Sequence, residues 1–427
     1  MRPAGLRSES APVLDVRLLG GILGTAMLLV LCPCFVRAAD LSRVGAVEII
    51  GATRSSRDTV LTVARVREGD PWREGLDAEV LQNLRNSPLF YDVAVEVRRT
   101  ARDVDLVIRL RDKWTLVPVP FAMSRGGDTS YGLTLMESNL FGTGSSLFLS
   151  ALVTDGVFGG SLFFVDPHVA GSRWSVFASG GQIDNEVNVW NEWEKTGSYR
   201  QRSTGVLAAL GYRFAERTTA SLGFRLYDEE MYEATAGTTA PADARRRAIS
   251  VSLIHEGANR FEERSHGTSG RVTLEQGLEV LGDQIGATTV SGEVRAAFNP
   301  LSDQTLLIVA RGFWTDQPAY ESSRTASFMR GYESGRFRPD RLIGGSLDYQ
   351  VPVLRLREVK LSLVPFADGA LLRDEYRSFT LEDFQLDAGV ALGVYLRRIA
   401  LPLIQITVAY GFDTQTVVPG FSLGFSF

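Results

Sequence analysis

The chain of 427 residues is poor in the residue types that build redox, metal and nucleophilic sites. Its two cysteines, Cys32 and Cys34, both lie near the N-terminus, and it has three histidines. A mature chain that begins after this segment has no cysteine, which excludes disulfides and thiolate metal sites. None of the histidines, His168, His255 and His266, belongs to a His-Glu-x-x-His motif, and no Gly-x-Ser-x-Gly elbow accompanies them. We therefore expect no enzymatic activity, no cofactor and no bound metal.

Long hydrophobic runs are equally scarce, and the longest, Leu18–Cys32, lies near the N-terminus. Arg17 precedes this run and small residues follow it, an order typical of a signal peptide. The run is too short to cross a bilayer as a helix. We therefore expect residues 1–38 to be a signal peptide. A lipoprotein anchor at Cys32 is the alternative, although Leu31 stands where such a site prefers a small residue.

Basic charge is not in excess. The 45 lysines and arginines are balanced by 50 aspartates and glutamates, which gives a formal net charge of −5. Because nucleic-acid binding needs a concentrated basic surface, this balance argues against a nucleic-acid partner.

Residues 39–112 have the pattern of a small α+β domain in the order strand, helix, helix, strand, strand. Alternating apolar residues predict the strands, and apolar residues three or four positions apart predict the helices. Ser55 or Ser56 is the expected N-cap of the first helix. The expected apolar stripes are Val60, Val63 and Ala64 on the first helix, and Leu76, Val80, Leu81 and Leu84 on the second. We expect both helices to pack on one face of a three-stranded sheet.

From residue 113 to residue 427, about sixteen segments alternate apolar residues with small or polar ones, and no helical stripe of useful length occurs. This pattern is typical of an antiparallel transmembrane β-barrel, in which alternate residues face lipid and lumen. The expected strands lie near 114–121, 129–138, 143–154, 156–166, 171–183, 202–213, 217–227, 244–256, 267–279, 285–299, 302–314, 341–352, 357–371, 384–398, 401–412 and 416–427. The expected long external connections are 184–201, 228–243, 315–340 and 372–383. Trp190 and Trp193, in the first of these, belong either to an interfacial aromatic girdle or to loop packing.

The connection before the strand at 341–352 contains the triplet Arg330-Gly331-Tyr332. Two carboxylates with lumen-facing parity follow on successive strands, namely Asp348 and Asp368. The triplet and these strands closely resemble the inward-folded sixth loop of the BamA/TamA (Omp-eighty-five) superfamily. In that family lumen carboxylates hold the arginine, so the resemblance implies a lock made of Arg330, Gly331, Tyr332, Asp348 and Asp368. The glycine of the family's Phe-x-Asp-x-Gly stands one place early here, as Gly369.

Two further stretches carry the resemblance. The chain ends on the alternating residues Phe421, Leu423, Phe425 and Phe427, which resemble the terminal signal of outer-membrane barrels. Residues 84–93 are similar to part of a POTRA domain, and one copy of this pattern is present. Their sequence is Leu-Arg-Asn-Ser-Pro-Leu-Phe-Tyr-Asp-Val. Such a domain binds an extended client by adding it as a strand to an open sheet edge. The resemblance implies a client-binding edge at Val93, Val95 and Val97, with a passive spacer as the alternative.

The sequence thus predicts a signal peptide at 1–38, a POTRA domain at 39–112 in the periplasm, and a barrel at 113–427 in the bacterial outer membrane. The resemblance implies a non-enzymatic insertase or translocase for unfolded outer-membrane or secreted proteins. Outer-membrane lipids and accessory periplasmic or lipoprotein subunits are the further partners that it implies. The alternatives are an exporter of one dedicated secreted protein and a passive channel or lipid-handling barrel.

Overall fold

The computed structural model describes residues 42–423, except 126–127, 155, 263, 318–327, 334 and 400–403. Its described elements all belong to one compact unit, Arg43–Phe427. The predicted signal peptide and the terminal residues Phe425 and Phe427 lie outside the described residues, so these expectations stay predictions. None of the helices in the described part of the chain combines the length and the apolar character needed to cross a bilayer.

The N-terminal elements follow the predicted order of strand, helix, helix, strand and strand. They are β1 (Arg43–Ile50), α2 (Arg57–Ala64), α3 (Leu76–Asn86), β2 (Phe90–Arg99) and β3 (Asp103–Asp112). The strand order in the sheet is β1-β3-β2, with β1 parallel and β2 antiparallel to the central strand β3. Both β1 and β2 are therefore edge strands of this small sheet.

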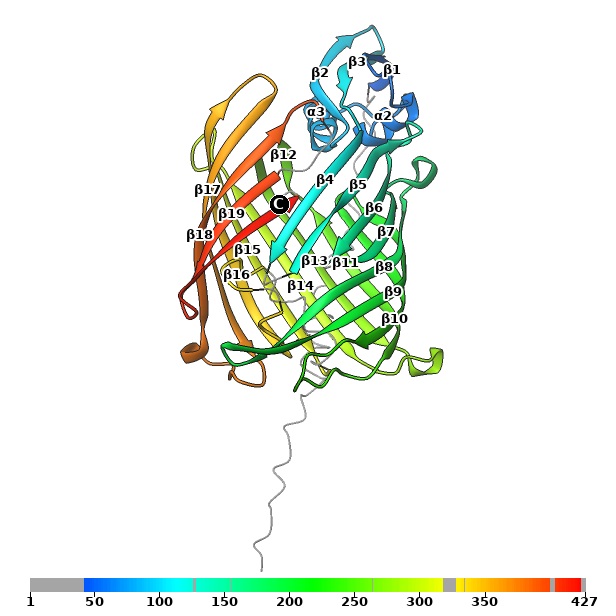
Figure 1. Cartoon of the computed structure of the whole chain (residues 1–427). Coiled ribbons are helices and arrows are strands. Elements are labelled where there is room, and N and C mark those ends of the chain that lie inside the picture. The colour runs from blue at the N-terminus through cyan, green and yellow to red at the C-terminus, as the bar shows by residue number, and fades with distance from the viewer. Residues whose placement is uncertain are drawn as a thin grey trace, which may run out of the picture. The chain divides into compact units, whose positions relative to one another are not determined.

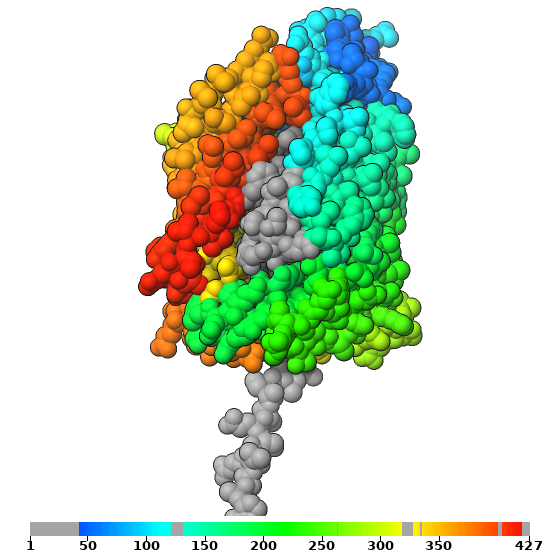
Figure 2. Space-filling model, viewed as in Figure 1, coloured from blue at the N-terminus to red at the C-terminus, as the bar shows by residue number. Residues whose placement is uncertain are grey.

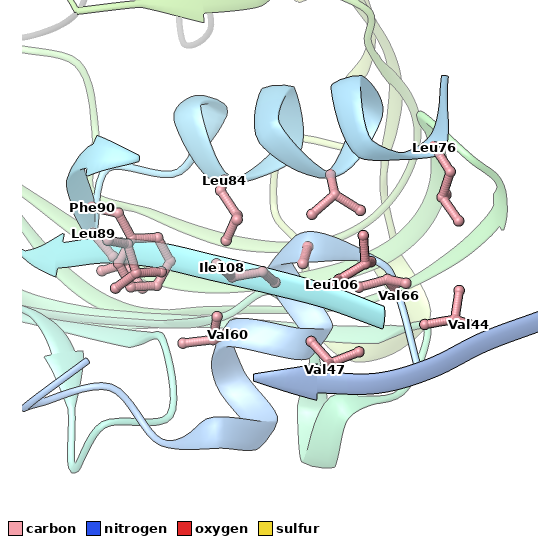
Figure 3. Packing of buried hydrophobic residues seen from close by; sticks show 13 residues of the cluster. Val44, Val47, Val60, Val66, Leu76, Leu84, Leu89, Phe90, Leu106 and Ile108 are labelled. Atoms are coloured by element: carbon pink, nitrogen blue, oxygen red, sulfur yellow. The ribbon is translucent and has the colours of Figure 1, made fainter. Parts of the chain in front are cut away.

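Both helices pack on one face of the small sheet, as the apolar stripes predict. Figure 3 shows Val60 and Leu84 from the two helices pointing toward Leu106 and Ile108 of β3. These four side chains are fully buried, and burial of such a side chain contributes about 1.5 to 3 kcal/mol. Of the two serines expected at the start of α2, Ser56 is the N-cap, and its Oγ accepts a hydrogen bond from the Thr59 amide at 3.1 Å.

The remaining strands close into an antiparallel barrel that runs from β4 to β20 (Figure 1). Each of the sixteen predicted segments corresponds to one of its strands, and the three-residue β12 is the strand that the alternation did not predict. The barrel strands are β4 (Leu116–Arg125), β5 (Asp128–Leu140), β6 (Ser145–Thr154), β7 (Val157–Asp166), β8 (Trp174–Asn191), β9 (Glu194–Ala215), β10 (Thr218–Tyr232), β11 (Ala244–Glu256), β12 (Asn259–Phe261), β13 (Arg264–Gly277), β14 (Thr288–Phe298), β15 (Thr305–Thr315), β16 (Arg341–Arg355), β17 (Val359–Arg373), β18 (Gln385–Leu396), β19 (Ile404–Gly411) and β20 (Thr416–Leu423). Among the described residues, the 3-10 turns η1 (Val169–Gly171), η2 (Glu279–Leu281) and η4 (Leu381–Asp383) lie in the connections.

The two faces of the barrel strands differ as the alternation requires. On β16, Ile343 and Leu347 are 61% and 48% exposed on the outer face, whereas the side chain of Asp348 is buried inside. On β17, Val364, Phe366 and Asp368 are likewise buried. Apolar residues on the outer face and polar ones inside are what a barrel in lipid needs, because the outer face meets hydrocarbon.

The prediction that residues 184–201 form a long external loop is wrong. The strands β8 and β9 continue through this segment as a long hairpin, paired from Trp174–Tyr212 to Asn191–Glu194. In this segment Asp184 and Arg200 are buried and form a salt bridge, with Nη2 of Arg200 2.7 Å from Oδ1 of Asp184. Polar side chains are therefore buried on these strands. The alternation of apolar and polar residues that marks a lipid-facing strand is therefore lost, although the backbone remains paired.

Candidate functional site

The guanidinium of Arg330 lies between the two carboxylates that the sequence identified. Its Nε and Nη2 donate to the two oxygens of Asp368 at 2.8 and 2.7 Å. Its Nη1 and Nη2 donate to the two oxygens of Asp348 at 3.3 and 2.6 Å. The Arg330 amide donates to Asp368 as well, at 3.1 Å. Paired N–H donors on two carboxylates are the geometry for which arginine is suited and lysine is not.

The surroundings of Arg330 reinforce this contact. The guanidinium carbon lies 3.5 Å from the ring centroid of Phe366, so the cation also stacks on an aromatic face. Burial opposes its charge, but the hydrogen bonds and charges of Asp368 and Asp348 outweigh burial and raise the pKa of Arg330. The arginine therefore stays charged at any pH that the protein meets.

Tyr332 and Gly331 fix the same loop against the next strands. The Tyr332 hydroxyl donates to Asp413 at 2.7 Å and lies 3.0 Å from the Leu386 carbonyl oxygen. Burial and the neighbouring Asp413 raise the pKa of Tyr332. A Cβ on Gly331 would lie 2.5 Å from the Cβ of Asp387 and 2.9 Å from the backbone nitrogen of Gly411. Glycine is needed at this position because the two backbones approach closely.

Sequence reasoning missed Asp387, which completes this cluster. It lies on β18 directly opposite Asp368 on β17, and it is fully buried. The signal that marks it is parity, since it shares the inner face of β18 with the buried Gln385 and Ala391. No motif of the resemblance covers it.

Loop six, defined as residues 316–340 between β15 and β16, has a second anchor on the β8–β9 hairpin. The guanidinium of Arg336 stacks on Trp190 and Trp193, with its carbon 4.5 and 4.9 Å from their ring centroids. Arg377 also stacks on Trp193, and on Phe337 of loop six. Its guanidinium carbon lies 4.6 and 4.8 Å from the two ring centroids. Of the two roles expected for these tryptophans, loop packing is the one that the structure supports.

The two edges of the small sheet are not equivalent. The first half of the β1 edge is covered by its own chain, since the Val44 amide donates to the Asp70 carbonyl and the Gly69 amide donates to the Val44 carbonyl, both at 2.8 Å. The Val47 amide donates to a side-chain oxygen of Glu68 at 3.1 Å. Within the described residues, the main chain of β2 from Ala94 to Val97 has ladder partners on β3 alone. The open edge is therefore that of β2.

The side chains of Val93, Val95 and Val97 face the domain's own core. They are partly buried and pack against the core under the helices, whereas Ala94, Glu96 and Arg98 are exposed. The groups of β2 that are open to a binding partner are therefore its main-chain N–H and C=O groups. Asp92 interrupts the ladder at a bulge between Tyr91 and Ala94 and adopts φ 52°.

A model of the Omp85 superfamily domain matches residues 139–427, which is more than half of the chain. The chain belongs to the Omp85 superfamily. As an Omp85 barrel it is an outer-membrane protein, and members of this superfamily handle polypeptide clients. The expected outer-membrane location is confirmed, and so is membership of a superfamily that handles polypeptide clients.

Solved structures agree with the fold of an Omp85 protein. BamA from Haemophilus ducreyi lacking POTRA domains 1–3 is 14% identical, with a TM-score of 0.50 over 89% of this chain and 83% of that one. CdiB from Acinetobacter baumannii is 13% identical, with a TM-score of 0.58 over 90% and 74%. CdiB from Escherichia coli is 14% identical, with a TM-score of 0.59 over 90% and 75%. No curated protein matches the chain.

The small α+β domain of this Omp85 protein contacts several turns of the barrel. The amide nitrogen of Asn86 on α3 donates to Asn259, and its oxygen accepts from the Arg260 amide at 2.7 Å. The Gly142 carbonyl accepts from the Ser56 amide at 3.0 Å and from the Thr59 hydroxyl at 2.7 Å. Three of these four hydrogen bonds use main-chain groups of the turns, so these three depend little on charge.

The open edge of the small sheet is also tied to the barrel. Arg397, in the connection between β18 and β19, pairs with Asp92 at 2.5 Å and with Glu262 at 3.0 Å. Lys113, between β3 and β4, donates to the Tyr395 hydroxyl at 3.2 Å. Burial, and then the charges of Arg260 and Arg397, lower the pKa of Lys113 to about 8.

The barrel of this Omp85 protein closes between its first strand, β4, and its last, β20. Figure 2 shows the last strands in red and the first barrel strands in cyan on either side of this closure. The predicted terminal residues Phe421 and Leu423 belong to β20, which pairs with β19 from Gly411–Thr416 to Ile404–Leu423. Trp114, just before β4, meets Ile399 in a single parallel bridge.

Proposed function

We propose that this protein is an outer-membrane insertase or translocase that receives unfolded polypeptide at the small domain, acting as a single POTRA domain, and passes it to the barrel. The observation that carries the proposal is the difference between the two edges of the small sheet. An extended client binds by main-chain hydrogen bonds, so it needs an edge whose N–H and C=O groups are free. The chain covers β1 at Val44 and Val47 and leaves β2 open from Ala94 to Val97.

The position of this edge supports the second half of the proposal. Arg397 ties the bulge of β2 to the connection before β19, and the Trp114 amide donates to the Arg398 carbonyl at 2.7 Å where the chain enters β4. A client strand on β2 would thus lie near the strands that close the barrel. Transfer into the membrane there needs no nucleotide, since apolar faces enter lipid and backbone groups become paired as the client folds.

In this proposal the Arg330 cluster holds loop six inside the closed barrel and the protein performs no enzymatic reaction. The exposed pair between Arg397 and Asp92 contributes little stability, about 0 to 1 kcal/mol, which suits a contact that a client displaces. The Arg330 contacts are buried and multiple, which suits a contact that is kept.

The test is photo-crosslinking in cells from a photoreactive residue placed at Ala94, whose side chain is exposed on β2. The matched control carries the same residue at Ala46, which is exposed on β1 between the covered residues Val44 and Val47. We expect polypeptide clients to be trapped at Ala94 in large excess over Ala46.

Mass spectrometry of the trapped proteins separates the candidate functions. Many different barrel precursors support an insertase, and one secreted protein supports the export of a dedicated partner. Equal trapping at both positions, or no polypeptide at either, would refute client binding at the β2 edge and favour a passive channel or lipid-handling barrel.

A further inference from the structure

Three aspartates from three adjacent strands surround the single guanidinium of Arg330. Asp348 is on β16, Asp368 on β17 and Asp387 on β18. Asp368 and Asp387 are direct partners in the ladder, and Asp348 lies opposite Phe366, two residues from Asp368. Directly opposed carboxylates repel each other across a strand pair. The cluster therefore holds more negative charge than one arginine balances.

The hydrogen bonds of Arg330 are distributed over two of the three carboxyl groups. A guanidinium has five N–H donors, and the contacts to Asp348 and Asp368 already occupy four of them. Neither oxygen of Asp387 has a donor at good hydrogen-bond geometry among the described residues, although its side chain is fully buried. The polar groups that face it are the Gly331 amide and the Asp368 carboxyl.

We propose that Asp387 is a proton-binding site and that its carboxylic acid donates a hydrogen bond to Asp368 in the closed barrel. One bound proton supplies the donor that Asp387 lacks, gives Asp368 another hydrogen bond and removes one of the two opposed charges. A buried, unpaired carboxylate costs far more than a neutral acid in the same place. The charge of Arg330 is then shared by Asp348 and Asp368.

Among the described residues packed against Asp387, Arg330 is the cation that faces it. Loop six presents Arg330, Gly331 and Tyr332, and the last of these is engaged with Asp413. From β19, Gly411 is its ladder partner. On β15, Arg311 is a further cation near Asp348 and Asp368, and it donates to Glu293 at 2.8 Å and to Ser346 at 3.0 Å.

The sign of the pH dependence follows from proton counting. An aspartate in the unfolded chain loses its proton near pH 4. The folded chain keeps the Asp387 proton at higher pH, so it binds more protons than the unfolded chain. Stability is thus fully present at low pH and is lost as pH rises, by up to about tenfold in the folding equilibrium per pH unit, until the folded chain also releases the proton.

The experiment compares purified full-length protein in detergent with two variants, Asp387→Asn and Asp368→Asn. Asparagine has the size of aspartic acid, carries no charge and donates a hydrogen bond, so Asp387→Asn reproduces the protonated state. The readout is the temperature at which the barrel loses its compact form on a gel, measured from roughly pH 5 to pH 9. Other titrating groups such as Lys113 contribute equally to the wild type and to Asp387→Asn.

We expect a midpoint that falls with pH in the wild type and falls less in Asp387→Asn, with the two proteins alike at low pH. Asp368→Asn should be less stable throughout, because it weakens the bonds to Arg330. Infrared spectra supply a second measurement, in which a carboxylic-acid carbonyl band of the wild type at neutral pH is lost in Asp387→Asn.

Parallel pH profiles or an unchanged infrared band would overturn the proposal, since each result means that Asp387 does not act as a neutral acid. If Asp387→Asn does not assemble, the wild-type spectrum decides, and the absence of a carboxylic-acid band at neutral pH overturns the proposal. None of these measurements involves a client. Their outcome is therefore independent of whether the protein inserts or exports polypeptides.

Discussion

Removal of the Arg330 guanidinium should lower the stability of the barrel substantially. In Arg330→Ala, the buried carboxylates of Asp348 and Asp368 lose their shared counter-ion. Loss of one partner from a buried ion pair costs about 3 to 5 kcal/mol. The Arg330 side chain is 20% exposed, so water screens part of its charge, and we expect the low end of this range, about 3 kcal/mol.

The variant Arg330→Lys separates the contribution of the positive charge from the contribution of the paired hydrogen bonds. An ammonium group keeps the positive charge, but it cannot form paired hydrogen bonds with two carboxylates at once. It also loses the planar stack on Phe366. We therefore expect an intermediate loss, because hydrogen bonds to charged groups contribute about 1.5 to 3 kcal/mol each and lysine keeps some of them.

The assay is the midpoint of heat-induced unfolding in detergent, followed by the change in gel mobility, together with the amount of assembled protein in membranes. A loss of about 3 kcal/mol corresponds to a fall of roughly 6 to 12 °C at 2 to 4 °C per kcal/mol. Arg357→Ala is the matched control, since this side chain is 79% exposed in the connection between β16 and β17. If Arg330→Ala unfolds at the same temperature as Arg357→Ala, the lock reasoning is refuted.

Two further substitutions test the close approach at Gly331 and the buried lysine near the entrance to β4. Gly331→Ala places a methyl group 2.5 Å from the Cβ of Asp387, so we expect a loss of about 1 to 3 kcal/mol in the same assay, whereas Gly312→Ala, where a Cβ meets open space, should be neutral. Burial and two nearby arginines lower the pKa of Lys113 to about 8, so the folded chain binds fewer protons than the unfolded chain between about pH 8 and pH 10.4 and its stability rises with pH there. Lys113→Met should abolish this rise, and a rise that persists in the variant would contradict the assignment.

Local patterns explain why the barrel strands and the Arg330 contacts were predictable. The parity of a strand is set by neighbouring residues, so Asp348 and Asp368 can be assigned to the inner face without knowledge of the fold. The triplet at Arg330 adds the family pattern, and the structure brings these three charged side chains together. The same parity assigns Asp387 to the inner face, but no residue type or spacing distinguishes it from other polar lumen residues.

Features that depend on distant contacts were not predictable. The pairing of β8 with β9 beyond Asp184 is covered by residues such as Arg338, whose guanidinium donates to the Asn188 carbonyl at 3.1 Å. Such burial of polar residues removes the alternation on which strand prediction depends. The open edge was assigned to β2 from resemblance, whereas the physical reason is that the segment around Asp70 covers β1.

The small domain and the Arg330 cluster make contact with opposite ends of one strand, β18. Asp387 and the Leu386 carbonyl lie at its first end, against Gly331 and Tyr332. At its other end, the Tyr395 hydroxyl accepts from Lys113, and Arg397, just after the strand, donates to Asp92. The ladders of β18 with β17 and with β19 run without a register shift, so continuous backbone pairing joins the two ends of the strand. In the proposed function, a client that displaces Asp92 would act next to the end of the strand whose other end carries Asp387, and a change in the heat stability of the Arg330 cluster on client binding would be the evidence for coupling.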